Sequence, residues 1–215
     1  GTAHIEDEIN MVGMQIDGML VLSDSLFGSV LGNSLRVGEG ISMNKSTIHS
    51  LNLVNASIGG SVDIFSSTIV ADADFNSVQI AQNLIIKDNS HLGKLEMANS
   101  LVDGVFQYEN SGVDEINMFN ARLENNIYLT NASVGRLLMD NAKVAGNTYV
   151  SGSRIKGQVL FSGSKLDGSL EFRGNTHIDN PLIMEGIQVG KTLLFQDVAL
   201  GGLDLTAARI QGNFH

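Results

Sequence analysis

The chain has 215 residues, 43% of them hydrophobic, with 24 glycines, one proline and no cysteine. This content is ample for a folded core, and the lack of cysteine excludes disulfides, thiol redox chemistry, and Cys-ligated zinc or iron–sulfur clusters. The formal net charge of −10 argues against nucleic acid or an anionic membrane surface as a partner. No apolar run approaches the roughly 18 residues of a membrane span, and the composition indicates no particular compartment.

Residues 1–15 follow the pattern of the remaining chain least well. Glu6, Asp7 and Glu8 stand beside an apolar stretch, which is typical of a polar cap over the end of a repeat domain. We therefore predict an N-terminal cap or irregular first coil over residues 1–15, followed by one repeat domain over residues 16–215.

The charge is unevenly distributed along the chain. Residues 1–120 contain 15 acidic and 4 basic residues, against 8 and 9 in residues 121–215.

An aliphatic residue returns every ten to twelve positions along the chain. Between these positions apolar and polar residues alternate, as in segments 155–161 and 166–172, and this period of two predicts strands rather than helices. The repeated positions are Ile5, Ile16, Leu26, Val37, Ile48, Ile58, Ile69, Ile80, Leu92, Val102, Val113, Leu123, Val134, Val144, Ile155, Leu166, Ile178, Val189, Leu200 and Ile210.

The position three residues before many of these aliphatic residues predicts a sharp corner. It holds residue types that tolerate a positive φ, and the next residue is often a small Ala or Ser that fits inside a tight corner. Stacked Asn side chains at this position are expected to hydrogen-bond to one another in ladders. The corner residues are Asn55, Asn89, Asn99, Asn110, Asn120, Asn131, Asn141, Gly152, Gly163, Asn175, Gly186 and Asp197.

Short strands and corners repeated about twenty times predict an all-β fold, a single-stranded right-handed parallel β-helix, or β-solenoid. Two units make a coil of 21–22 residues, so we expect about ten coils and a rod roughly 45–50 Å long. Phe161 and Met184 should form one interior stack, and Phe172 and Phe195 another. An open sheet edge follows Gly212, so we expect either end-to-end self-association through the C-terminal coil or continuation as part of a longer chain.

The sequence predicts no cofactor and no metal site. The segment 186–192 resembles a phosphate-binding P-loop, but it is one residue short and stays in register with the strand repeat. His4, His91 and His177 share one repeat position, about eight units apart from one to the next, which is too far for one metal ion to bind them together.

Three carboxylates are the candidate catalytic residues. Asp72 and Asp74 would lie on one strand face, about 7 Å apart, which approaches a calcium-binding or acid/base geometry. Asp63 holds the matching place to Asp74 in the preceding unit. The alternative interpretation of all three is a solvated outer face.

Three basic residues form the candidate interaction surface. Arg122, Lys143 and Lys165 each directly precede an aliphatic residue and are one coil apart. They are expected to form a basic stripe that binds an anionic partner, or else to be ordinary surface side chains.

The repeated blocks resemble bacterial β-solenoids whose sequences run as "ArIgGdLdLsgA". The resemblance is carried by the segments Ser57-Ile-Gly-Gly-Ser-Val-Asp-Ile and Ala208-Arg-Ile-Gln-Gly-Asn-Phe. It implies a β-solenoid over nearly the whole chain, and such sequences often carry the label of a membrane-associated oxidoreductase. The chain is more distantly similar to pentapeptide-repeat proteins, acidic rods of which some mimic DNA, although the strict five-residue pattern is missing.

Spacing confined to ten to twelve residues leaves no long loops from which to build the walls of a catalytic cleft. We therefore favour a non-enzymatic scaffold or interaction module that binds a protein or glycan along a rod face, with no integral membrane segment and no nucleic-acid partner. The alternatives are a carbohydrate-active β-helix enzyme that uses Asp63, Asp72 and Asp74, and an acidic mimic of nucleic acid.

Overall fold

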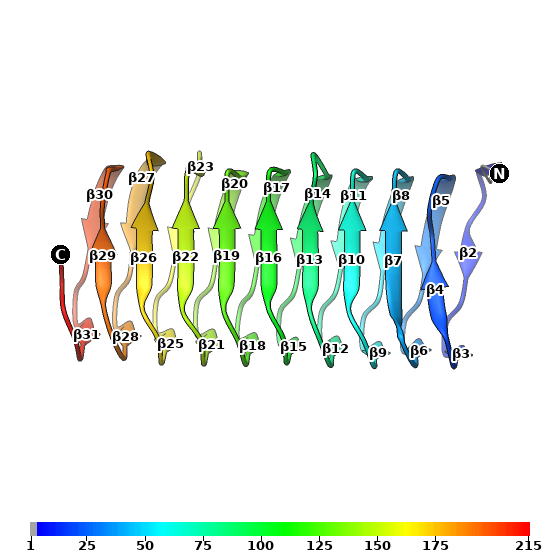
Figure 1. Cartoon of the computed structure of the whole chain (residues 1–215), viewed down its shortest axis with the longest axis horizontal. Coiled ribbons are helices and arrows are strands. Elements are labelled where there is room, and N and C mark those ends of the chain that lie inside the picture. Colours follow the sequence, from blue (N-terminus) through cyan, green and yellow to red (C-terminus); the bar gives the residue numbers. More distant parts are fainter. Residues whose placement is uncertain (1–3) are drawn as a thin grey trace.

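The computed structural model describes residues 4–215, which form a single stack of parallel coils. The described chain consists of strands, turns and bends without a helix, and each strand pairs with the strand about one coil later, as Arg122 does with Lys143 and Lys143 with Lys165. The coils stack side by side into a rod with the two termini at opposite ends (Figure 1). The predicted β-solenoid of about ten coils is confirmed.

Each coil contributes to three parallel sheets, which we call A, B and C. Sheet C faces the viewer in Figure 1, sheet B runs along the lower edge, and sheet A lies behind. Sheet C contains β4 (Met19–Val21), β7 (Gly40–Asn44), β10 (Val62–Phe65), β13 (Leu84–Lys87), β16 (Phe106–Glu109), β19 (Ile127–Thr130), β22 (Thr148–Ser151), β26 (Leu170–Arg173) and β29 (Leu193–Phe195).

Sheet B is built entirely from two-residue strands, each ending on an aliphatic residue of the repeat. Its members are β3 (Gln15–Ile16), β6 (Arg36–Val37), β9 (Ser57–Ile58), β12 (Gln79–Ile80), β15 (Leu101–Val102), β18 (Arg122–Leu123), β21 (Lys143–Val144), β25 (Lys165–Leu166), β28 (Gln188–Val189) and β31 (Arg209–Ile210).

Sheet A has the longest strands, and several of its pairings contain a register shift. Its members are β1 (His4–Ile5), β2 (Ile9–Asn10), β5 (Leu26–Leu31), β8 (Thr47–Asn52), β11 (Thr68–Asp74), β14 (His91–Glu96), β17 (Gly112–Asn117), β20 (Ser133–Leu138), β23 (Arg154–Ile155), β24 (Val159–Leu160), β27 (Thr176–Ile183) and β30 (Val198–Asp204).

The predicted N-terminal segment 1–15 is described only from residue 4. Within it β1 and β2 pair with β5, and β3, which begins at Gln15, pairs with β6. Residues 1–3 of the predicted segment lie outside the described residues. The part from residue 4 onward therefore adds strands to sheets A and B.

The two segments that illustrated the alternating pattern each bend in the middle, where the pattern had predicted one continuous strand. The segment 166–172 is divided between β25 in sheet B and β26 in sheet C, and the segment 155–161 contains two separate strands, β23 and β24. At the first bend the coils approach closely, because a Cβ placed on Gly168 would lie 2.3 Å from the carbonyl oxygen of Gly146. Only glycine fits that backbone without a shift.

One position of the predicted aliphatic column is wrong. Phe27, not Leu26, pairs with Ile48 and is buried, whereas Leu26 pairs with Thr47 and is exposed. Two adjacent apolar residues satisfied the spacing equally well at this point. The pairing across neighbouring strands decides between them, because inward and outward positions alternate along a strand.

The predicted corners are confirmed at all twelve positions, whose φ angles lie between 48° and 67°. The predicted Asn ladders also form: Asn120 Nδ2 donates to Asn99 Oδ1 at 2.7 Å, and Asn131 Nδ2 donates to Asn110 Oδ1 at 3.1 Å. A second, buried ladder runs through serines, in which the backbone N–H of one serine donates to the Oγ of the serine one coil later. It links Ser46, Ser67, Ser90 and Ser111.

The interior is a continuous apolar core made of the inward residues of the three sheets. The predicted stack of Phe172 on Phe195 is confirmed, with ring centroids 5.3 Å apart and ring planes 7° from parallel. Phe161 and Met184 directly follow the paired residues Leu160 and Ile183, and both are buried.

Thr148 is a polar exception in this core. Its side chain is 1% exposed on β22, and its hydroxyl has no hydrogen-bond partner among the described residues. A buried unsatisfied hydroxyl costs free energy that an apolar group of the same shape does not. We therefore expect Thr148→Val to raise the free energy of unfolding by about 1 kcal/mol, measured by urea denaturation.

Thr176→Val is the matched control for that substitution. Thr176 is equally buried, but its hydroxyl donates to the carbonyl oxygen of Arg173 at 2.6 Å. Removing this hydroxyl should lower the free energy of unfolding by about 1 kcal/mol. If both substitutions destabilised the protein alike, the assigned surroundings of Thr148 would be incorrect.

Candidate functional site

The three candidate catalytic carboxylates do not share one face. Asp63 lies on β10 of sheet C, whereas Asp72 and Asp74 lie on β11 of sheet A. A pair of carboxylates that works as acid and base must flank the same substrate bond. The predicted grouping of all three is therefore corrected: only Asp72 and Asp74 share a strand.

Asp63 is a partly buried carboxylate on the outer face of sheet C. It pairs in register with Ser42 on one side and Ile85 on the other. Burial raises the pKa of the Asp63 carboxyl, and the positive charge of Lys87 partly offsets this rise. The Lys87 ammonium lies 4.8 Å from the ring centroid of Phe65, two residues from Asp63 on the same strand.

Asp74 has a local structural role. Its Oδ1 accepts the backbone N–H of Asn76 at 3.1 Å, a turn-forming hydrogen bond at the corner that follows β11. Asp72 pairs in register with Lys94 of the next coil. Asp72 and Asp74 thus both lie in the surroundings of a charged outer face. This agrees with the alternative interpretation of these residues from the sequence.

The histidines that share a repeat position do lie in one column of sheet A. His4 and His91 are separated by strands β5, β8 and β11, and His91 and His177 are separated by strands β17, β20 and β23. Among residues 4–215, His, Asp and Glu side chains form no group of three that could hold a metal ion. The P-loop-like segment contains a corner at Gly186 and strand β28.

The three predicted basic residues do come together. Arg122 pairs in register with Lys143, and Lys143 with Lys165, on the outer face of sheet B. Neighbouring strands of a sheet lie about 4.8 Å apart. Arg122, Lys143 and Lys165 therefore form a row along the rod axis, which we call the basic strip.

Two of the three cations in the basic strip are paired on their own strand segment. The Arg122 guanidinium contacts the Glu124 carboxylate, and Lys165 Nζ lies 2.9 Å from Asp167 Oδ1. Alternate residues of a strand face the same side, which brings each cation to the carboxylate two residues later. Both pairs are largely open to water, so each contributes little to stability.

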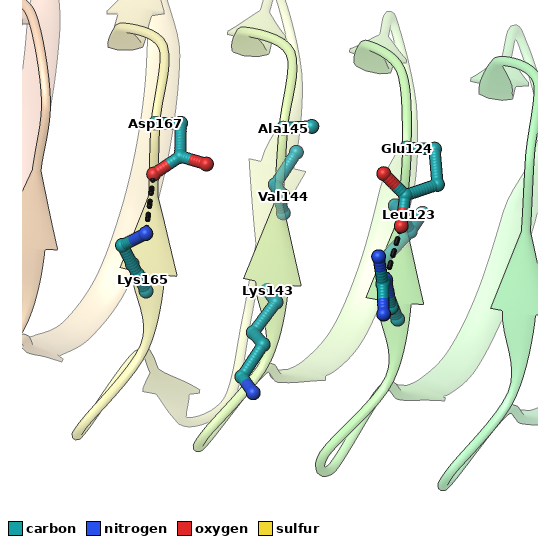
Figure 2. Close-up of a pocket in the computed structure, with 8 residues that line it drawn as sticks. Leu123, Glu124, Lys143, Val144, Ala145, Lys165 and Asp167 are labelled. Carbon is teal, nitrogen blue, oxygen red and sulfur yellow. Dashed lines mark hydrogen bonds and ion pairs between the residues drawn. The ribbon is translucent and has the colours of Figure 1, made fainter.

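Lys143 differs because the residue two positions later is Ala145. Within the described part of the chain Lys143 makes no ion pair, and its side chain extends away from Ala145 (Figure 2). Ala145 lies between Glu124 and Asp167 of the adjacent coils in the same view. The row of acidic partners is thus interrupted opposite the central cation.

A groove follows the basic strip. It has a volume of about 270 Å³ and is lined by the three cations together with Glu124, Ala145 and Asp167. A second groove of about 300 Å³ shares Lys165 and Asp167 with it and continues over Gln188 and Lys191. The two grooves form a shallow path along sheet B that crosses several coils.

The sequence reasoning found the cations but missed what surrounds them. The pairing of Arg122 with Glu124 and of Lys165 with Asp167 was not predicted. The signal was present, since each carboxylate stands two residues after its cation on a strand. The small residue Ala145 at the same place after Lys143 is the third member of this pattern.

No family model, curated protein or solved structure matches the chain. The resemblance to the repeated-block β-solenoids remains a prediction from the residues themselves. Within the described residues, no helix is long and apolar enough to cross a membrane.

Proposed function

We propose that the chain is a non-enzymatic scaffold or interaction module, and that it binds a protein or glycan partner along the outer face of sheet B. The observation that carries this proposal is the basic strip. Arg122, Lys143 and Lys165 stack on consecutive coils beside a groove, and the central cation has no acidic partner in the described chain.

The regularity of the rod supports the same proposal. Connections between strands are short corners and bends, so each outer face is a broad and shallow surface. Deep pockets with convergent polar groups are the usual setting for catalysis on small molecules. A shallow face with repeated charges is better suited to a partner that extends over several coils.

A photo-cross-linking amino acid at position 188 tests this proposal. Gln188 is exposed on β28 of sheet B and lines the groove that also contains Lys165. The control position is Gln158, which is exposed between strands β23 and β24 of sheet A. In an extract of the source cells we expect an adduct from position 188 and none from position 158. Protease and glycosidase treatment of the adduct then identifies a protein or a glycan.

The charge of the basic strip should control this adduct. Lys143→Glu places a carboxylate in the middle of the strip, so it should reduce cross-linking from position 188, as should raised salt. Equal adducts from positions 188 and 158, or none from either, would rule out sheet B as the interaction face.

A further inference from the structure

The charge of the groove indicates which class of ligand it can bind. The two grooves along sheet B are lined by four cations, Arg122, Lys143, Lys165 and Lys191, against the two carboxylates of Glu124 and Asp167. The whole chain, by contrast, has a net charge of −10. This path is a local basic surface on an acidic rod, so it is complementary to an anionic ligand.

The spacing of the cations favours a repeating ligand. Arg122, Lys143 and Lys165 are one strand spacing apart, about 4.8 Å, in a straight row. An extended peptide presents side chains to one face only every second residue, at about 6.6–6.8 Å, and so would not match consecutive coils. A polymer with a charged group on each of its units can follow the row.

The groove lacks the features of a protein interface. Its apolar lining residues Leu123, Val144 and Leu166 are each only 1% exposed, and none of the large hydrophobic side chains exposed in residues 4–215 lines it. Protein partners usually bind through aromatic or aliphatic anchors at the centre of the contact. The strands of sheet B also contain no aromatic residue on which a nucleic-acid base could stack.

We propose that this groove binds an acidic polysaccharide, a linear glycan carrying carboxylate groups, laid along the rod axis across β18, β21 and β25. One glycan carboxylate lies over Ala145 and pairs with Lys143, in the place that Glu124 and Asp167 occupy beside their own cations. The flexible stem of Lys143 lets its ammonium turn from its present direction toward that carboxylate. This assignment rests on the proposed function of the same face.

The direct test is binding of polygalacturonate to the whole protein, measured by calorimetry at low salt. Its methyl-esterified form is the uncharged control with the same backbone, and poly-L-glutamate is the peptide control. We expect polygalacturonate to bind, with affinity that falls as salt rises, and the methyl ester and poly-L-glutamate to bind at least about tenfold more weakly.

Two substitutions test the position of the carboxylate. Ala145→Asp supplies the missing acidic partner from the chain itself, so it should occupy Lys143 and lower the affinity for polygalacturonate about tenfold. Lys143→Glu should lower it at least as much. Lys156→Glu makes the same charge change at an exposed residue of the sheet A region and should leave the affinity unchanged. Unchanged circular dichroism confirms that the variants are folded.

The outcomes separate this inference from the proposed function. If position 188 cross-links to a partner but polygalacturonate does not bind, sheet B remains the interaction face and the glycan assignment is wrong. The assignment is equally wrong if the methyl ester or poly-L-glutamate binds as tightly as polygalacturonate, or if Ala145→Asp has no effect.

Discussion

Ile69→Asp should lower the free energy of unfolding by about 4 kcal/mol or more, the range reached by a buried group without a partner. Ile69 lies on β11 with no exposed surface and pairs with Ile48 and Leu92 of the adjacent coils. A carboxylate there has no cation and no donor from those two aliphatic neighbours. Even if it takes up a proton, it remains a buried polar group in an apolar column.

Val70→Asp is the control, because Val70 is the next residue on the same strand and is 55% exposed. It introduces the same charge into the same coil, on the outer side. Its effect should stay within about 1 kcal/mol, as expected for a surface position. Urea denaturation followed by circular dichroism measures both. Similar losses for the two variants would show that the inward and outward faces of β11 are assigned incorrectly.

The repeat made most of the fold predictable, because one small set of constraints recurs in every coil. An aliphatic residue inside, a small residue before it and a residue with positive φ before that determine where the chain turns. Asn120 illustrates this: its φ of 55° and its hydrogen bond to Asn99 both follow from its place in the pattern. The buried serine ladder could not be predicted in the same way. A small residue at a corner does not reveal from which N–H its hydroxyl oxygen will accept a hydrogen bond.

Two features of the fold depend on contacts between coils and could not be predicted within one unit. Leu26 and Phe27 are both apolar, and only the pairing with Thr47 and Ile48 distinguishes them. The bend at Gly168 depends on the approach of the Gly146 carbonyl from the preceding coil. Glycine in a strand pattern is compatible with a bend, a bulge or a close contact, so the sequence leaves the choice open.

The parts of the candidate site that repeat from coil to coil could be predicted from the sequence, and the other parts could not. Arg122, Lys143 and Lys165 have equal places in their coils, so their alignment follows from the repeat. Asp63 and Asp74 also have matching places, but in units that lie on different sheets, and a position within a unit does not say which sheet that unit faces. Residues at matching places become neighbours only when they are one full coil, that is two units, apart in the sequence.

Phe172→Ala should be the second large loss, about 3–5 kcal/mol of unfolding free energy, the usual cost of truncating a buried phenylalanine. Phe172 has no exposed surface, its ring is stacked on Phe195, and its edge meets Phe161 with centroids 6.4 Å apart. The truncation removes both ring contacts and leaves a cavity. The coils on either side are held in place by their strand pairing and cannot move together to fill it.

Phe172→Leu provides the comparison that separates volume from aromatic contact. The residue paired with Phe172 in the preceding coil is Val150, so an aliphatic side chain is already accommodated in this column. We expect the leucine variant to lose about 1–1.5 kcal/mol, the cost of a swap that keeps most of the volume.

A loss for Phe172→Ala no larger than that for Phe172→Leu would mean that the core closes around the vacancy. The coils would then be held together by their backbone ladders more than by side-chain stacking, and hydrogen exchange in β22, β26 and β29 would be unchanged. Faster exchange confined to those three strands is the expected result, because each coil of a solenoid contacts only its neighbours.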